Sequence, residues 1–96
     1  MNVITEKYIE LWQLKKVELP ETFGTTYECS LFSIAPIYFN ELESSKNLVK
    51  VIYFSDIGEV SFRFSAVMLS DVDWIKEQLT YYINQGIKSI KKRLER

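Results

Sequence analysis

The chain has 96 residues, of which 47% are hydrophobic and 15% aromatic, with 12 basic and 13 acidic side chains. This length and hydrophobic content suit one packed core, so we expect a single domain over residues 1–96. The net charge of −1 argues against a uniformly basic nucleic-acid-binding protein. No apolar run approaches the roughly 20 residues needed to cross a bilayer, which argues against membrane spanning.

Residues 3–16 form the first periodic segment, and their pattern fits either a helix or a strand. We favour a helix, because most of the apolar side chains share one helical face. Ile9 is the exception and lies off that face. The residues on that face are Ile4, Tyr8, Leu11, Trp12 and Leu14.

Two stretches in the middle of the chain then have the composition of strands. The first runs from Tyr27 to Ile34 and the second from Ile37 to Leu42. Pro36 lies between them and cannot donate a hydrogen bond to a neighbouring strand. We therefore expect a bulge or an edge position at Pro36.

A β-hairpin is predicted from residue 48 to residue 68. Residues 47–54 are an almost continuous apolar run, and in residues 60–68 every second side chain is apolar, with the aromatic face toward the core. Between them, residues 55–58 read Ser-Asp-Ile-Gly, which is typical of a turn.

The clearest element is a long C-terminal helix that we expect to begin at Ser70, with that serine as its N-cap. Gly86 is the one weak point of this helix and should cost about 1 kcal/mol relative to alanine. The apolar side chains fall within an arc of roughly 140°, which predicts the face that packs on the sheet. They are Val72, Ile75, Leu79, Tyr82, Ile83, Ile87, Ile90 and Leu94.

These segments together predict an α+β fold. It consists of a three- or four-stranded antiparallel sheet, a long C-terminal helix packed on one face of the sheet, and an N-terminal helix.

Residues with the usual catalytic and metal-binding chemistry are scarce. The chain has no histidine, which removes the commonest general base and metal ligand. Cys29 has no second cysteine for a disulfide or a zinc site, and we interpret it as a small buried hydrophobe. Asp56 and Glu59 are the closest carboxylate cluster, in a predicted turn, where a solvated pair is the simpler interpretation. We therefore expect no catalytic residue, no metal and no cofactor.

The lone cysteine also bears on the compartment, because disulfide-stabilised secreted domains carry cysteines in pairs. The first residues lack the basic and then apolar pattern of a secretory signal. Both features favour a cytoplasmic protein.

Charge is distributed unevenly along the chain. Residues 88–96 carry five basic side chains against one acidic one, a local charge of +4, so the first 87 residues sum to −5. Basic residues suit the negative pole at the end of a helix, which gives this charge a structural explanation as well as a functional one.

A candidate binding surface lies on the C-terminal helix, outside the apolar arc. Its aromatic and polar side chains fall within roughly 60° of arc, and large aromatics left on an outer face need a partner or a cover. A protein interface, including a homodimer, is one interpretation, and coverage by the N-terminal segment is the other. The residues are Trp74, Tyr81, Gln85, Lys88 and Lys92.

One short stretch resembles a known family. Residues 68–74, Met-Leu-Ser-Asp-Val-Asp-Trp, followed by Lys-Glu-Gln at residues 76–78, look like the last strand and helix of positive-cofactor-four-type proteins. The resemblance covers about a dozen residues and implies a dimer that binds single-stranded DNA. This sequence departs from the family in its sheet, where Lys46, Lys50 and Arg63 stand among many carboxylates.

The sequence thus favours a non-enzymatic protein-interaction domain, a small regulator or inhibitor that acts by occupying a partner's surface. A viral, mobile-element or toxin-neutralising accessory protein would have this size and these features. The net negative charge of the first 87 residues suits a basic or nucleic-acid-handling protein partner. The alternative is a dimer that binds single-stranded nucleic acid through the sheet and the basic C-terminal helix.

Overall fold

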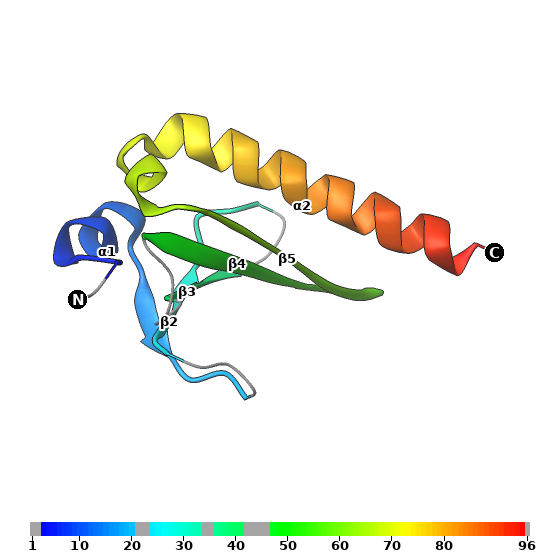
Figure 1. Ribbon diagram of the computed structural model, residues 1–96, viewed down its shortest axis with the longest axis horizontal. Coiled ribbons are helices and arrows are strands. Elements are labelled where there is room, and N and C mark those ends of the chain that lie inside the picture. Colours follow the sequence, from blue (N-terminus) through cyan, green and yellow to red (C-terminus); the bar gives the residue numbers. More distant parts are fainter. Residues whose placement is uncertain (1–2, 21–23, 34–35, 42–46, 96) are drawn as a thin grey trace.

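The computed structural model describes residues 3–20, 24–33, 36–41 and 47–95. Its elements in chain order are α1 (Glu6–Trp12), β1 (Lys15–Val17), β2 (Thr26–Cys29), β3 (Ile37–Glu41), β4 (Leu48–Ser55), β5 (Gly58–Ser65), the 3₁₀ helix η1 (Ala66–Ser70) and α2 (Val72–Leu94). Figure 1 shows α2 lying beside β5, with α1 and the last turn of α2 toward opposite ends of the long axis. Within the described residues, no helix is long and apolar enough to cross a membrane.

The five strands form one antiparallel sheet in the order β1-β2-β3-β4-β5. Each strand pairs with its neighbour in the chain, so β1 and β5 are the two edges. The β1 edge is only three residues long, whereas β5 presents eight residues. The long edge of this sheet therefore lies at β5.

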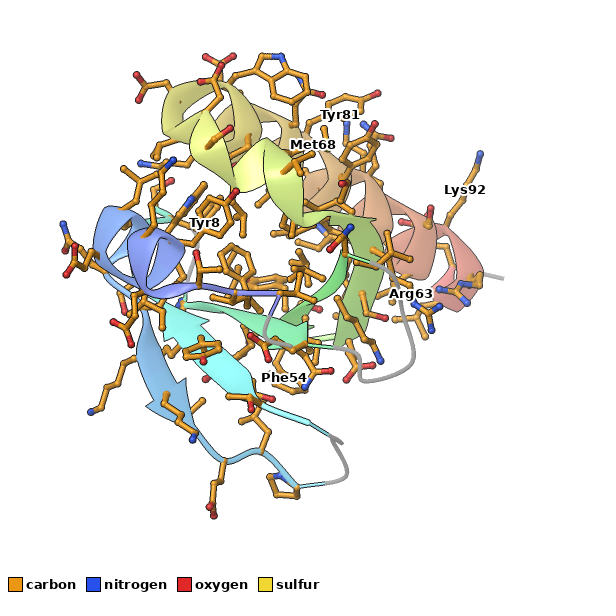
Figure 2. The ribbon with its side chains drawn as sticks, turned by 60° about the vertical axis from the view of Figure 1, so that its left-hand side comes forward. Tyr8, Phe54, Arg63, Met68, Tyr81 and Lys92 are labelled. Carbon is orange, nitrogen blue, oxygen red and sulfur yellow. The ribbon has the colours of Figure 1, made fainter. Side chains whose placement is uncertain are left out.

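Strand register separates the side chains into two faces. Phe39 pairs with Val51, which pairs with Phe62, and all three point to the side of the sheet that α2 covers. Tyr38, Ile52 and other alternate residues point to the opposite side, where Figure 2 shows Phe54. The main core therefore fills the space between the helices and one face of the sheet.

Trp12 lies at the centre of this core and is fully buried. Its indole Nε1–H donates a hydrogen bond of 2.8 Å to the carbonyl of Leu69 in η1. The ring stacks on Phe32 at a centroid distance of 6.2 Å and meets Phe39 edge-on at 5.6 Å. One side chain therefore joins α1, β3 and the segment that leads into α2.

Helix α2 approaches β5 closely at Gly86. A Cβ placed on Gly86 would lie 2.5 Å from Cγ1 of Val60, a distance that no real contact reaches. Four residues further on, Ile90 lies over Gly58, the first residue of β5. Gly86 was expected to be a weak point of the helix, but its missing side chain lets the helix pack against the strand.

The predicted fold class is confirmed, with five strands where three or four were expected. The helix predicted over residues 3–16 is shorter than that range, because it ends at Trp12 and is followed by β1 at Lys15–Val17. Gln13 ends the helix in the left-handed conformation, with φ of 52°, and turns the chain into the strand. Its side chain carries no β-branch, so this conformation is less costly than it would be for valine or isoleucine.

The remaining strand boundaries differ in detail from the prediction. The hairpin at residue 48 is confirmed, but its second strand ends at Ser65 and residues 66–70 form η1. Pro36 directly precedes β3, an interior strand, and so occupies neither a bulge nor an edge. Ile34 and Leu42 lie outside the described residues.

Corrections also apply to α2. Its N-cap is Asp71 and not Ser70, since the Asp71 carboxylate accepts the backbone N–H of Trp74 at 3.3 Å. Of the predicted apolar face, Ile75, Leu79 and Ile83 are buried. Val72, Ile87 and Ile90 are half-buried. Two members are exposed, Tyr82 at 52% and Leu94 at 65%. Leu94 lies beyond the position where Ile90 reaches the first residue of β5, so no strand residue lies beneath it.

We expect Gly86→Ala to destabilise the protein, although alanine is the better helix former by about 1 kcal/mol. The new methyl group overlaps Val60, and overpacking of this kind costs roughly 1–3 kcal/mol. Urea denaturation measures the change, and Val60→Ala provides the matched background in which the same substitution should cost less. A gain in stability from Gly86→Ala alone would show that the close contact is absent.

Candidate interaction surface

Cys29 points into the core and is fully buried. Its thiol donates to the Trp12 carbonyl at an Sγ to O distance of 3.8 Å. Burial raises the pKa of this thiol above its ordinary value, and the Leu31 backbone N–H and Lys76 oppose that shift only in part. The interpretation of Cys29 as a buried hydrophobe is therefore confirmed.

The buried polar side chains are engaged in structural hydrogen bonds. Oε1 of Glu41 accepts the backbone N–H of Ile4 at 2.9 Å, which holds the N-terminal segment against the end of β3. Nδ2 of Asn40 donates to the Thr26 hydroxyl at 2.8 Å and ties β3 to β2. Within the described part of the chain, no three acidic or cysteine side chains form a group that could hold a metal ion.

The predicted binding residues of α2 are all exposed, but they form an elongated set. Trp74 is 45% exposed and Tyr81 57% exposed, and Gln85, Lys88 and Lys92 are also exposed. At 1.5 Å per residue, Trp74 and Lys92 lie about 27 Å apart along the helix. Figure 2 accordingly shows Tyr81 and Lys92 well separated along α2.

A groove of about 400 Å³ lies between α2 and β5. Phe62 and Phe64 point to the helix side of the sheet, whereas Arg63 points to the other side. Because the groove touches all three residues, it extends to the free edge of β5. Its lining is mainly apolar and consists of Phe62, Arg63, Phe64, Met68, Trp74, Ile75, Gln78, Leu79 and Tyr82.

Tyr82 is the functional candidate that the sequence analysis missed. The apolar arc placed it in the core, but it lies at one limit of that arc, on the side of β5. Its ring packs against Phe62 at a centroid distance of 5.6 Å and stays half-exposed at the groove. The sequence did hold a signal for this position, because Tyr82 is a tyrosine at the limit of the apolar arc. Tyrosine suits a site where the ring packs on apolar groups and the hydroxyl reaches solvent.

Tyr81 lies on a different part of the helix from Trp74. Its ring meets that of Tyr82 edge-on at 5.6 Å, but it does not line the groove. Instead, Tyr81 borders a shallow depression on the other flank of α2, together with Lys76, Glu77, Thr80 and Asn84. The structure therefore joins Trp74 to Tyr82 and β5 at the groove, whereas Tyr81 contacts Tyr82 from outside the groove.

The edge of β5 also offers backbone groups. Ser55 pairs with Gly58 across a two-residue loop, and such a closing pair is hydrogen-bonded, after which bonded and non-bonded pairs alternate along the ladder. By this alternation, Glu59, Ser61 and Arg63 direct their N–H and C=O groups away from β4. No strand among the described residues pairs with that side of β5.

Comparison of the chain with protein-family models, with curated proteins and with solved structures finds no match. The candidate surface therefore rests on its own geometry, which is an aromatic groove beside an unpaired strand edge.

We expect Cys29 to be unreactive in the folded protein, because only the thiolate attacks and burial keeps this thiol protonated. A colorimetric disulfide reagent should react with it far more slowly in buffer than in denaturant, where the exposed thiol has an ordinary pKa. Equal rates in the two conditions would contradict the burial of Cys29.

Proposed function

We propose that this chain is a non-enzymatic protein-interaction domain that binds an extended protein segment in the groove between β5 and α2. It acts as a small regulator or inhibitor by occupying its partner's surface. The observation that supports this function is the coincidence of an apolar groove with a free strand edge.

Strand addition is the recognition mode that fits these two features. The outward N–H and C=O groups of Glu59, Ser61 and Arg63 provide main-chain hydrogen bonds for an added strand. Alternate side chains of that strand point to the helix side, where the groove accepts apolar groups. Backbone pairing thus supplies affinity, and the groove supplies selectivity.

The aromatic side chains of the groove suit an interface. Trp74 and Tyr82 are half-exposed, and tryptophan and tyrosine are enriched among the residues that dominate binding energy. Phe62 supports Tyr82 from the strand below. A bound segment would remove these rings from water and complete the apolar layer between helix and sheet.

Charge bears on the partner class. The first 87 residues sum to −5, which favours a basic or nucleic-acid-handling protein as the partner, because opposite charges accelerate encounter. Arg63 is the charged residue of the groove lining. An apolar segment with an acidic residue next to Arg63 and basic residues further out would match both features.

Single-stranded nucleic acid is the second candidate ligand, favoured by exposed aromatic and basic side chains on one helix. Lys88, Lys91, Lys92 and Arg93 are all exposed near the end of α2. The groove and Trp74 lie toward the opposite end of the helix, so bases stacked on Trp74 would leave these charges about 21–29 Å away. The protein ligand therefore agrees better with the geometry.

Peptide selection tests this function. Peptides selected from a random displayed library on the immobilised domain should carry bulky apolar residues at alternating positions. Trp74→Ala with Tyr82→Ala should weaken their binding roughly a hundredfold or more, since interface hot spots cost about 2 kcal/mol or more each. Fluorescence anisotropy with labelled synthetic peptides measures the affinity.

Tyr81→Ala is the matched control, because it removes a ring of the same kind from the neighbouring residue outside the groove. It should reduce affinity far less than the double variant. An equal loss of peptide affinity with Tyr81→Ala would show that the peptide binds the outer face of α2 and not the groove. Salt-sensitive binding of labelled oligothymidylate, with no peptide enriched, would favour the nucleic-acid function instead.

A further inference from the structure

We propose that the segment bound in this groove belongs to a second copy of the chain, whose β5 pairs antiparallel with β5 about a two-fold axis at Ser61. The inference rests on the proposed function, since it names the occupant of the same groove. Two features carry it, namely the order of charges along β5 and the direction in which the unpaired backbone groups of that strand point.

The charges of β5 are self-complementary in only one symmetric register. Glu59, Ser61 and Arg63 share one face of the strand, and all three are exposed. With the axis at Ser61, Glu59 lies opposite Arg63 of the second copy, and the same pair recurs on the other side of the axis. An axis at Glu59 or at Arg63 places like charges opposite each other, which is destabilising.

Backbone geometry agrees with this register. Glu59, Ser61 and Arg63 are the residues whose N–H and C=O groups point away from β4. Ser61 opposite Ser61 of the second copy is then a hydrogen-bonded pair, and so is each Glu59–Arg63 pair. The two sheets join into one continuous sheet of ten strands, and neither copy retains its long free edge.

The α2 helices of the two copies also come together in this register. α2 runs back along β5, so that Ile75 and Leu79 lie near Phe64 and Gly86 lies on Val60. An axis at Ser61 therefore brings the first half of α2 toward the second half of α2 from the other copy, with the two helices running in opposite directions.

The flank of α2 that faces the second copy is the one that lines the groove with Trp74, Gln78 and Tyr82. Lys76 and Glu77 border the depression on the other flank and point away from the second copy. Because the two helices run in opposite directions, their dipoles oppose each other favourably.

The same contact would cover the exposed groove. Gly58 of the second copy lies opposite Phe64 in this register, which places the hairpin tip of that copy beside the groove. Trp74 and Tyr82 then lie between the two helices. A standard interface covers roughly 800 Å² per partner, about an eighth of the 6615 Å² surface of this chain.

Sedimentation equilibrium over a wide range of protein concentration tests the dimer. The wild-type chain should dimerise, and its melting temperature should rise with concentration. Glu59→Arg or Arg63→Glu alone places like charges opposite each other twice, and should weaken dimerisation roughly tenfold or more. The double variant Glu59→Arg with Arg63→Glu restores both pairs and should recover most of the wild-type affinity.

Lys7→Glu is the matched control, because it makes the same change in net charge as Arg63→Glu on an exposed position of α1. It should leave the dimer unchanged. A monomer at every concentration overturns the second copy as the occupant, and peptide binding lost on removal of Trp74 and Tyr82 would then leave the proposed function standing. The register, and with it the proposal, is overturned if the single charge reversals leave the dimer affinity unchanged. It is likewise overturned if the double variant does not recover that affinity.

Discussion

The hydrogen bond from the Trp12 indole to the Leu69 carbonyl fixes the arrangement on which the rest of the structure depends. It links residues 57 positions apart in the chain, inside a core from which water is excluded. A buried carbonyl without a hydrogen-bond partner would destabilise the fold. The indole N–H supplies that partner and so permits the chain to bury this part of its backbone. η1 is thereby held against α1, and α2 leaves from a defined point at the end of β5.

From that point, the position of α2 over the sheet follows from packing. Ile75, Leu79 and Ile83 enter the core, and the missing side chain of Gly86 lets the helix settle on Val60. These contacts hold the second half of α2 close to β5 and leave a groove beside Phe62 and Phe64. The candidate surface is thus a consequence of how one helix lies on one edge strand.

Much of the fold was predictable because its contacts are local. Hydrophobic periodicity identified the hairpin and α2, and each strand pairs with its neighbour in the chain. β1 was not predictable, because its three residues, Lys15–Val17, carry almost no alternating pattern and form a strand only by pairing with β2. The boundary at Ser65 was missed for a related reason, since Ala66 and Met68 continue the alternation into η1.

The sequence by itself determined the α+β class, the centre of the apolar face of α2 and the burial of Cys29, since each follows from composition or from periodicity within one element. Only the tertiary structure decided which aromatics meet. Tyr82 belongs to the groove and Tyr81 does not, because that distinction depends on which flank of α2 faces β5. The role of Gly86 was likewise decided by Val60, a residue 26 positions earlier, whose approach no pattern within the helix could reveal.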